Sequence, residues 1–505
     1  MKTAPQTLHR SAVAASAAVL VFLHANGPVE AAYTYVGNVT SYQQNGSSFV
    51  FTCGTPKVLV SFLAEDMVRV RMAQFGTFPP NPPWVVQKYD WEPVTVTPSD
   101  QGAYYELATA RLRVRVQKSP CVISFYTMDN RLISKDHDTY RMAFDSGSFR
   151  VDKDVQSGDK FFGFGERFAN GANKFGTVIP MVTDDAYHTA TDDHTYMSAP
   201  FFCSPMGYGI YFNNPGADSP GLNKRCVFRL GTDAPTRWSF ESHTGDLDYF
   251  FIYGPHLLHV INRYTELTGR PKLPPLWTFG LGLIVNGFGT DTGRTACDQF
   301  RSNDIPADMM GYDDLWKDCN GNFKWFWKDC IESPGDCNWG SSTVVPDLAY
   351  MKSIGFKTWV WIVPSILDGP TCGDNQETGI ANNWFVKQAN GITDYAISPW
   401  YGAGYYVDFT QQTATEWYKS LCKDVRTTAY HPDPYKNVSA QPDVFKTDDG
   451  EYMPHDARVK VGWYGQQGSF NTGLEFDNLY PMLYNNAVCD SVRERTGRGF
   501  TLYRA

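Results

Sequence analysis

The sequence predicts two successive folds: an antiparallel β-sandwich, followed by a parallel α/β unit of the (β/α)-barrel type. In residues 32–254, apolar and polar residues alternate through short segments, which is the period of strands with one buried face. In residues 255–505, short apolar segments alternate with helical stretches, as they do in parallel sheets. These later segments are apolar throughout, as expected of strands buried on both faces. A chain of 505 residues has room for two or three domains.

Residues 1–31 have the features of a secretory signal peptide. Basic residues precede the apolar run "SAVAASAAVLVFLHA", and Val29 and Ala31 are small residues at the spacing of a cleavage site. The alternative is a membrane anchor, but an anchor needs about 20 apolar residues, and His24 and Asn26 end this run earlier. We therefore expect cleavage after Ala31 and a secreted, extracellular protein.

Eleven cysteines and three N-glycosylation sequons agree with secretion. Four cysteines crowd one region, where we expect disulfide bonds of unassigned pairing that hold an insertion: Cys319, Cys330, Cys337 and Cys372. The sequons begin at Asn38, Asn45 and Asn437. A net charge of −9 with no basic stripe predicts that nucleic acid is not a partner. No later apolar run is long enough to span a membrane.

In the first region, turn clusters of Gly, Asn, Asp and Pro separate the expected strands. "KVLVSFLAEDMVRVRM" (57–72) and "ARLRVRVQ" (110–117) show the alternation most clearly. "GPHLLHVINRYTEL" (254–267) then has its apolar residues at helical spacing, and "TGRPKLPPLW" (268–277) ends this helix with glycine and prolines. The change of period marks the domain boundary.

The second region contains five apolar segments that we expect to be parallel strands. They lie at residues 277–285, 306–313, 356–364, 442–448 and 498–505. Helical patterns separate them at residues 295–304, 347–355, 413–425 and 478–497. In a (β/α) barrel, the active residues gather at the carboxyl ends of the strands.

Residues that suit a sugar substrate occur at four of these strand ends. The second strand ends in Asp313, the third carries Trp361, the fourth ends in Lys446 and Asp448, and the fifth ends in Arg504. Carboxylates accept hydrogen bonds from hydroxyl groups, and an indole ring stacks on the apolar face of a sugar. The pattern indicates a site for a neutral, polyhydroxylated substrate. The alternative is a set of solvated loop charges.

The stretch "FKTDDGEYMP" (445–454) resembles the nucleophile signature of glycoside hydrolase family 31. Other stretches resemble the same family in the same order: "FFGFGERF" (161–168), "YMSAPFFCSPMGYGIYFNNP" (196–215), "LPPLWTFGLGL" (273–283), "IPADMMGYDDLW" (305–316) and "GFKTWVWIVPSI" (355–366). The resemblance runs from about residue 160 to the last residue. It implies that the α/β unit is an incomplete (β/α)8 TIM barrel, with about five strands present.

Carried over residue by residue, the resemblance implies that Asp448 is the catalytic nucleophile. It also implies the substrate-binding residues Asp313, Trp361, Lys446, Arg504 and Asp185, the last from a loop of the N-terminal domain. Glu451 matches the acid of the motif, and we expect it to support the shape of the loop. The "KTD-x-GE" form resembles the xylosidase, galactosidase and sulfoquinovosidase members of the family more than the maltases.

A retaining glycosidase needs an ionised carboxylate that attacks the sugar and a protonated acid about 5 Å away. Lys446 or Arg504 would keep Asp448 ionised. Asp449 follows directly, and adjacent strand residues point to opposite faces, so we expect Asp449 to be a loop acid outside the site. The family's acid/base lies on a segment after the fifth strand, and we expect it to be absent from this chain.

The sequence therefore predicts a retaining α-glycoside hydrolase that acts on α-linked glucosides, xylosides or related sugars in carbohydrate metabolism. Its partner would be an oligosaccharide or glycoside substrate. The alternative is a catalytically inactive, truncated homologue, or a carbohydrate-binding fragment that lacks the acid/base. No cofactor or metal is expected, since "DCNGNFKWFWKD" (318–329) has Phe323 where a calcium loop needs glycine.

Overall fold

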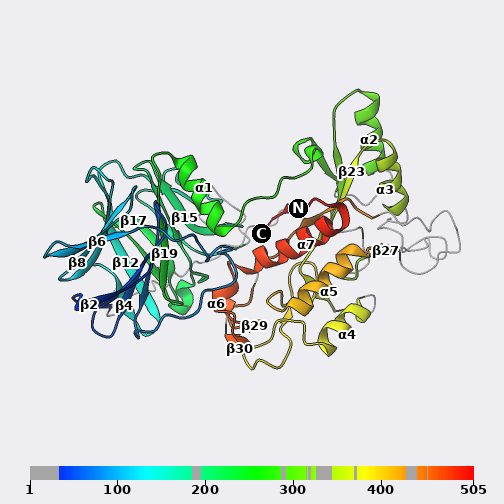
Figure 1. Cartoon of the computed structure of the whole chain (residues 1–505). Coiled ribbons are helices and arrows are strands. Elements are labelled where there is room, and N and C mark those ends of the chain that lie inside the picture. Colours follow the sequence, from blue (N-terminus) through cyan, green and yellow to red (C-terminus); the bar gives the residue numbers. More distant parts are fainter. Residues whose placement is uncertain are drawn as a thin grey trace, which may run out of the picture. The chain divides into compact units, whose positions relative to one another are not determined.

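The computed structural model describes Trp316 and nine stretches of the chain: residues 33–184, 195–285, 292–313, 320–325, 344–368, 372–427, 441–451, 453–471 and 473–504. Strands β1 to β19 come first, helix α1 follows, and strands then alternate with helices (Figure 1). The predicted signal peptide and Asp185 lie outside the described residues.

The described residues from Thr34 to Tyr253 form three antiparallel sheets. The eight-stranded sheet has the order β13 (Phe162–Gly165), β15 (Ser198–Ser204), β16 (Tyr208–Phe212), β19 (Leu247–Tyr253), β5 (Met67–Ala73), β4 (Lys57–Ala64), β3 (Ser48–Thr52) and β2 (Ser41–Asn45). The six-stranded sheet has the order β1 (Thr34–Tyr35), β11 (Ala143–Asp145), β12 (Ser148–Asp154), β18 (Arg237–Ser242), β17 (Cys226–Ala234) and β14 (Val178–Pro180). The five-stranded sheet has the order β10 (Leu132–Lys135), β9 (Cys121–Tyr126), β8 (Arg113–Lys118), β7 (Tyr104–Ala108) and β6 (Thr97–Asp100).

One apolar core receives side chains from all three sheets. Phe49, Phe125, Trp238 and Phe251 are buried in it, and they come from β3, β9, β18 and β19. The rings of Phe125 and Phe251 stack with their centroids 3.8 Å apart, which joins the five-stranded sheet to the eight-stranded sheet. Burying one such ring stabilises the fold by about 2 kcal/mol. The predicted β-rich region is confirmed, and its arrangement as a sandwich stays a prediction.

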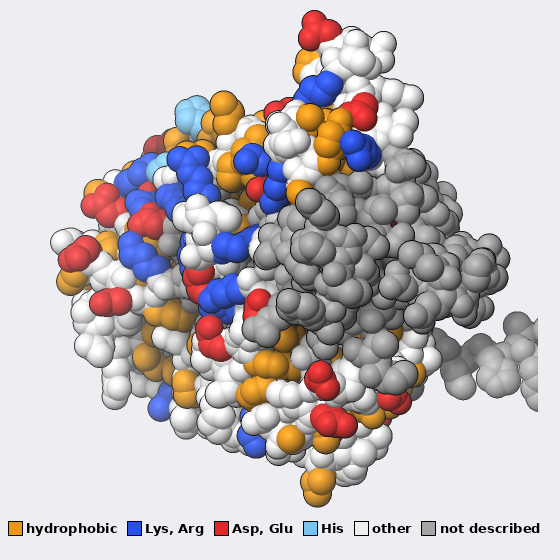
Figure 2. Space-filling view, turned by 90° about the vertical axis from the view of Figure 1, so that its right-hand side faces the viewer, with side chains coloured by type: hydrophobic (Ala, Val, Ile, Leu, Met, Phe, Trp, Pro, Cys, Tyr) orange, Lys and Arg blue, Asp and Glu red, His pale blue; other side chains and the backbone are white. Residues whose placement is uncertain are grey.

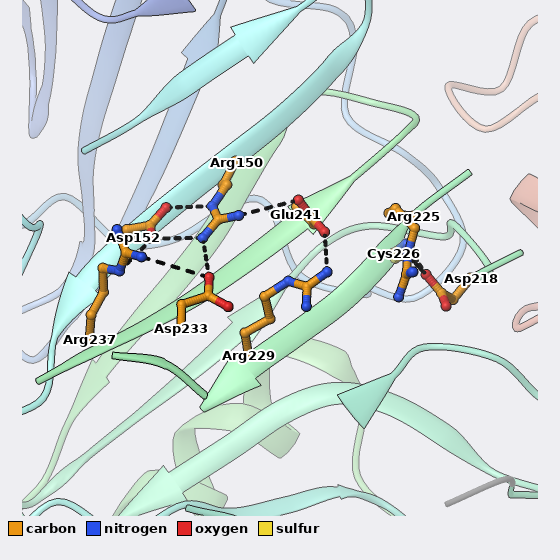
Figure 3. A network of polar contacts seen from close by, with 9 residues as sticks. All are labelled: Arg150, Asp152, Asp218, Arg225, Cys226, Arg229, Asp233, Arg237 and Glu241. Carbon is orange, nitrogen blue, oxygen red and sulfur yellow. Dashed lines mark hydrogen bonds and ion pairs between the residues drawn. The ribbon is translucent and has the colours of Figure 1, made fainter. Parts of the chain in front are cut away.

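The face of the six-stranded sheet that points away from this core carries charges. In β12, Phe149 and Val151 join the core, so Arg150 and Asp152 point to the other side. Arg150 donates to Asp152 Oδ2 and to Asp233 Oδ2, each at 2.7 Å. Six side chains form this β-domain network (Figure 3): Arg150, Asp152, Arg229, Asp233, Arg237 and Glu241.

Helix α1 (Leu257–Thr268) covers part of the eight-stranded sheet and confirms the helix predicted there. The buried carboxylate of Asp66 ties it to the strands, because Arg263 Nε donates to Asp66 at 2.9 Å and His259 Nε2 lies 2.9 Å from it. Arg111 pairs with the same carboxylate at 2.7 Å. The helix is therefore fixed by charge as well as by apolar packing.

The second region contains a five-stranded parallel sheet. Its strands are β20 (Gly282–Val285), β21 (Met309–Tyr312), β23 (Lys357–Ile362), β28 (Val444–Thr447) and β31 (Leu502–Tyr503). The predicted helices correspond to α2 (Thr292–Ser302), α3 (Val344–Ser353), α5 (Gln412–Lys423) and α7 (Tyr480–Thr496). Among the described residues, β20 and β31 each pair on one side only, so the sheet is a half-barrel. The five strands lie within the predicted segments, but each is shorter than predicted, and the first begins only after the 3-10 helix η2 (Leu276–Phe279).

Smaller elements lie between the strands of the half-barrel, and the sequence pattern did not predict them. They are β22 (Lys324–Trp325), β24 (Ser365–Leu367), α4 (Gly373–Ala381), β25 (Ala396–Ile397), β26 (Gly404–Tyr406), β27 (Arg426–Thr427), β29 (Arg458–Val461), β30 (Gln467–Asn471) and α6 (Gly473–Phe476). Each strand among them has at most five residues, which is too short to show a period.

Specific hydrogen bonds join the β-rich region to this second region. Trp84 Nε1 donates to Trp463 O at 2.9 Å, and Asn478 Nδ2 donates to Gly216 O at 2.9 Å. Asn478 Nδ2 also donates to Met181 O at 3.2 Å. The bonds of Asn478 hold Met181 and Gly216 next to the residues that precede α7.

The described surface combines charged and apolar side chains. On the face in Figure 2, Lys and Arg side chains lie among Asp, Glu and hydrophobic side chains. Within the described stretches, none of the helices has both the length and the apolar character that crossing a membrane requires.

Candidate active site

Asp448 stands at the carboxyl end of β28, an inner strand of the half-barrel. β28 pairs with β23 on one side and with β31 on the other. The Asp448 N–H donates to Ile362 O at 3.0 Å, which extends the pairing with β23 by one step. The residue is only 5% exposed. A buried carboxylate at this end of a parallel strand needs partners that stabilise its charge.

Three side chains supply these partners. Trp361 Nε1 donates to Asp448 Oδ2 at 2.7 Å, and Lys446 Nζ lies 3.0 Å from the same oxygen. Arg504 Nε lies 2.5 Å from Asp448 Oδ1. Each oxygen of the carboxylate thus faces a cation, so its ionised form is stabilised on both sides.

The strand register explains why these partners converge. Trp361 of β23 is paired with Lys446 of β28, so the two side chains lie side by side on one face of the sheet. Asp448 is two residues beyond Lys446 and points to the same face. Trp316 Nε1 donates to Trp361 O at 2.6 Å, so Trp316 is hydrogen-bonded to the backbone of β23.

Asp313 follows β21 and extends the site across the sheet. Lys446 Nζ lies 3.7 Å from Asp313 Oδ1 and 3.0 Å from Asp448 Oδ2, so one ammonium group lies between two carboxylates. The Asp313 side chain is 23% exposed, which leaves part of it open to a ligand.

Arg504 is shared by three carboxylates. Besides Asp448, its guanidinium contacts Asp449 Oδ1 at 2.5 Å and Glu451 Oε1 at 3.0 Å. The Tyr196 ring lies 4.7 Å from Arg504 Cζ, within the range of a cation–π contact. Burial alone would lower the pKa of Arg504, but the facing carboxylates outweigh it and raise that pKa. Arg504 therefore stays charged.

Glu451 carries a proton at neutral pH. The residue is 2% exposed, and burial raises the pKa of its carboxyl group to about 8, against the opposing effect of Arg504. Asp449 and Asp448 raise that pKa further. Glu451 Oε2 has no hydrogen-bond partner among the described residues. Glu451 and Asp448 thus contact the same arginine, and the role of Glu451 in shaping the loop stays a prediction.

The expectation that Asp449 lies outside the site is wrong. β28 ends at Thr447, and Asp449 has a φ of 52°, in the left-handed region, so the alternation of strand side chains no longer applies. Asp448 and Asp449 therefore both reach Arg504. Seven side chains form this Asp448 cluster: Asp313, Trp361, Lys446, Asp448, Asp449, Glu451 and Arg504.

Two aromatic residues beside the cluster were missed in the sequence. The ring centroids of Trp400 and Tyr401 lie 5.9 and 6.0 Å from that of Trp361. Trp400 Nε1 donates to Asp449 Oδ1 at 3.4 Å, and the residue is 68% exposed, so its ring is open to a ligand. Both stand in "SPWYGAG", whose glycines and adjacent aromatics are the only signal that could have identified them.

A cavity of about 570 Å³ lies beside Glu451, between the β-rich region and the half-barrel. Thr183, Asp184, His455 and Asp477 are among the residues that line it. Asp477 is 3% exposed, and burial followed by the charge of Asp184 raises the pKa of its carboxyl group well above its usual range. The cavity reaches Glu451, but Asp448 does not line it. In the described stretches, no group of three His, Cys, Asp or Glu side chains is arranged to hold a metal ion.

Comparison with known proteins agrees with this geometry. Residues 57–217 match the Glycosyl hydrolase 31 N-terminal galactose mutarotase-like domain, and residues 271–505 match the Glycosyl hydrolases family 31 TIM-barrel domain. The chain belongs to glycoside hydrolase family 31. The stretch "KTDDGE", which contains Asp448 and Glu451, lies within the second match.

Relatives of this family-31 chain include transferases and hydrolases. An isomaltosyltransferase of Sporosarcina globispora is 28% identical, with 93% of this chain and 43% of the relative covered. An α-xylosidase XylQ of Lactiplantibacillus pentosus is 26% identical, with 88% and 53% covered. A Flavobacterium johnsoniae dextranase, solved in complex with glucose, has a TM-score of 0.79 at 25% identity, with 94% of this chain and 55% of that structure covered. The chain thus spans about half the length of the relatives it matches.

Proposed function

We propose that this chain supplies the nucleophile and part of the sugar site of a retaining α-glycoside hydrolase, with Asp448 as the nucleophile. The observation that carries the proposal is the Asp448 carboxylate, which is buried and yet held by Lys446, Arg504 and the Trp361 indole. An ionised carboxylate in a water-poor site is the group that such an enzyme uses to attack a sugar.

In the proposed first step, an Asp448 oxygen attacks the anomeric carbon while the bond from that carbon to the leaving oxygen breaks. Water then hydrolyses the glycosyl ester, so the configuration is retained overall. Asp448 loses its charge when the ester forms. Lys446 still faces Asp313 and Arg504 still faces Asp449, so neither cation is left uncompensated during the intermediate.

The leaving oxygen needs a proton, and Glu451 does not fit that role. Glu451 is protonated but 2% exposed, and its contact is with Arg504. We therefore assign the acid/base to the segment that the family resemblance gives after the fifth strand, and we assign Glu451 to the support of Arg504.

We infer that the substrate is an α-linked glucoside, xyloside or related sugar. Asp313 and Lys446 offer an acceptor and a donor to sugar hydroxyl groups, and Trp400 offers an exposed ring beside Trp361. Relatives named α-xylosidase, α-glucosidase and isomaltosyltransferase support this range. The second candidate is a sugar-binding protein without turnover, which is favoured by the exposed Trp400 ring and the partly exposed Asp313 side chain, since both can bind a sugar without any reaction.

We also propose that the protein is secreted after cleavage behind Ala31. Asn38 and Asn45 are exposed, as glycosylation would require, whereas Asn437 lies outside the described residues. Cys372 is disulfide-bonded, and its partner also lies outside the described residues, so the pairing stays a prediction. Sequencing the N-terminus of the protein from culture medium tests the cleavage site.

The nucleophile is tested with α-glucosyl and α-xylosyl fluorides that carry a second fluorine on the ring. Fluoride leaves without help from a general acid, and the ring fluorine slows hydrolysis of the ester, so the glycosyl-enzyme accumulates. We expect the chain to gain the mass of one fluorinated sugar on the peptide that contains Asp448. Asp456→Asn is the matched control, because Asp456 is an exposed acid in the same loop region.

Labelling at any other residue, or none at concentrations that saturate binding, would contradict the nucleophile assignment. Binding of the sugar without labelling, measured by calorimetry, would support the second candidate. Loss of labelling in Asp448→Asn, with binding retained, would separate the attack from recognition.

A further inference from the structure

Three successive carbonyl groups at the carboxyl end of β23 each accept a hydrogen bond from a buried aromatic side chain. Three donors form this carbonyl clamp: Trp316 to Trp361 O at 2.6 Å, Tyr484 of α7 to Ile362 O at 2.9 Å, and Tyr418 of α5 to Val363 O at 2.5 Å. Each donor residue is at most 1% exposed, so these bonds satisfy carbonyl groups that are buried from water.

The Ile362 carbonyl group joins the carbonyl clamp to Asp448. Its oxygen accepts the Asp448 N–H at 3.0 Å as well as the Tyr484 hydroxyl at 2.9 Å. A carbonyl oxygen has two lone pairs, so it can accept both hydrogen bonds. Tyr484 therefore holds the group that in turn holds the backbone of Asp448.

Helix α7 makes a second contact beside Asp448. Thr447, the last residue of β28, donates its hydroxyl group to Asn485 Oδ1, and Asn485 follows Tyr484 in the helix. Arg504 N donates to Thr447 O at 3.0 Å, which joins the end of β31 to the same residue. Helix α7 is thus hydrogen-bonded to the carboxyl ends of both β23 and β28.

Aromatic packing fixes the Tyr484 ring. The residue is 0% exposed, and its ring centroid lies 5.6 Å from that of Phe409 and 5.9 Å from that of Tyr418. Helices α5 and α7, which carry Tyr418 and Tyr484, lie side by side (Figure 1). The Tyr484 hydroxyl group therefore reaches Ile362 O from a ring that is held by the core.

We propose that Tyr484 is a positioning residue for the attack by Asp448, an inference that rests on the proposed function. The Tyr484 hydroxyl fixes the Ile362 carbonyl, and this carbonyl fixes the backbone from which the attacking carboxylate projects. Attack requires a carboxylate oxygen within about 3–3.5 Å of the anomeric carbon, and a displacement of about 1 Å slows such a reaction by about 10²-fold. Without the hydroxyl group, the end of β23 loses one bond to α7, and we expect a smaller displacement of Asp448.

The test compares Tyr484→Phe with Tyr480→Phe in the full chain. Each substitution removes one buried hydroxyl group of α7 that donates to a backbone carbonyl at 2.9 Å. Tyr480 donates to Val407 O, in the segment after β26, whereas Tyr484 donates to the carbonyl that also binds Asp448. We expect both variants to lose a similar amount in Tm, because each loses one hydrogen bond of the same kind.

Labelling by the ring-fluorinated glycosyl fluorides separates positioning from stability. At saturating concentration, we expect Tyr484→Phe to label Asp448 about 10-fold more slowly, with the half-saturating concentration unchanged within about twofold. Tyr480→Phe should keep both values within about twofold of the original protein. Equal labelling rates in the two variants, at similar losses in Tm, would show that Tyr484 is only a core residue and would overturn the proposal.

Hydrogen exchange tests the positioning without any reaction. The Asp448 N–H should exchange at least about 5-fold faster in Tyr484→Phe than in Tyr480→Phe, as measured by mass spectrometry of the peptide that contains it. If the original protein is not labelled, the nucleophile assignment fails, and the exchange rate still decides whether Tyr484 holds the backbone of Asp448. Equal exchange in the two variants would overturn the inference in either case.

Discussion

Two of the clusters of arginines and carboxylates among the described residues differ in charge balance. In the β-domain network, three arginines face three carboxylates: Arg150, Arg229 and Arg237 against Asp152, Asp233 and Glu241. In the Asp448 cluster, two cations face four carboxyl groups: Lys446 and Arg504 against Asp313, Asp448, Asp449 and Glu451. The first cluster is matched, and the second has an excess of acid.

The excess has a physical consequence. A matched network can ionise completely, because each carboxylate has an arginine within reach. In the Asp448 cluster, three carboxyl groups share Arg504, and one of them, Glu451, keeps a proton, because burial first and then the charges of Asp449 and Asp448 raise its pKa to about 8. Because protonated Glu451 is neutral, the charge of Arg504 interacts mainly with Asp448 and Asp449. The difference indicates that the first network serves stability and the second is arranged around one ionised carboxylate.

The largest expected effect is that of Asp448→Asn. The substitution preserves the size of the side chain and removes the attacking oxygen, so the rate of labelling by a ring-fluorinated glycosyl fluoride should fall at least about 10³-fold. Arg150→Met in the β-domain network should leave that rate within about twofold of the original. A fall of similar size in both variants would mean that the two clusters do not differ in function.

The second effect is that of Arg504→Met, which leaves three carboxyl groups without their shared cation. We expect labelling to slow by about 10²-fold, since the ionised form of Asp448 loses one of its two cations. Adding Glu451→Gln should not lower the rate further, because Glu451 already carries a proton and does not compete with Asp448 for a cation. Arg237→Met is the control from the other network. If the double variant were slower than Arg504→Met, the shared-cation account would be wrong.

The third effect concerns the pH dependence of stability. The pKa of Glu451 is about 8 in the fold and near its usual lower value in the unfolded chain, so folding takes up a proton between these values. The contribution of Glu451 is therefore complete at low pH and is lost as pH rises toward 8. The free energy of unfolding should fall by about 2–4 kcal/mol more in the original protein than in Glu451→Gln between pH 5 and 8. Urea unfolding at several pH values measures this difference, and Glu416→Gln, at an exposed acid, is the control.

Much of the half-barrel could be predicted from the sequence. Each parallel strand is an apolar segment with polar residues at its end, so Trp361, Lys446, Asp448 and Arg504 could be assigned to one mouth before their distances were known. The parallel register then brings Trp361 and Lys446 together without any further signal.

The error over Asp449 and the omission of Trp400 have local causes. The rule that strand side chains alternate stops where the strand stops, and the positive φ of Asp449 turns its carboxylate back toward Arg504. Trp400 stands between two short strands with no period, so only the fold brings it near Trp361. The protonation of Glu451 depends on burial, which a sequence pattern does not report.

The smallest effect tests whether the equal number of arginines and carboxylates in the β-domain network contributes to stability. The Asp233 side chain is 26% exposed and pairs with Arg150 at 2.7 Å and with Arg237 at 3.8 Å, so Asp233→Asn leaves three arginines against two carboxylates. We expect a loss of about 0.5–1 kcal/mol in the free energy of unfolding at low ionic strength, because partly exposed pairs contribute little. The loss should shrink at 1 M salt, where screening is strong, and labelling at Asp448 should not change. Asp138 is a more exposed acid that pairs locally with Lys135. Asp138→Asn should therefore lower the free energy of unfolding by less, because it does not leave a group of arginines with too few carboxylates. Equal losses in the two variants would mean that the network is a set of independent surface pairs and that its matched charge has no role.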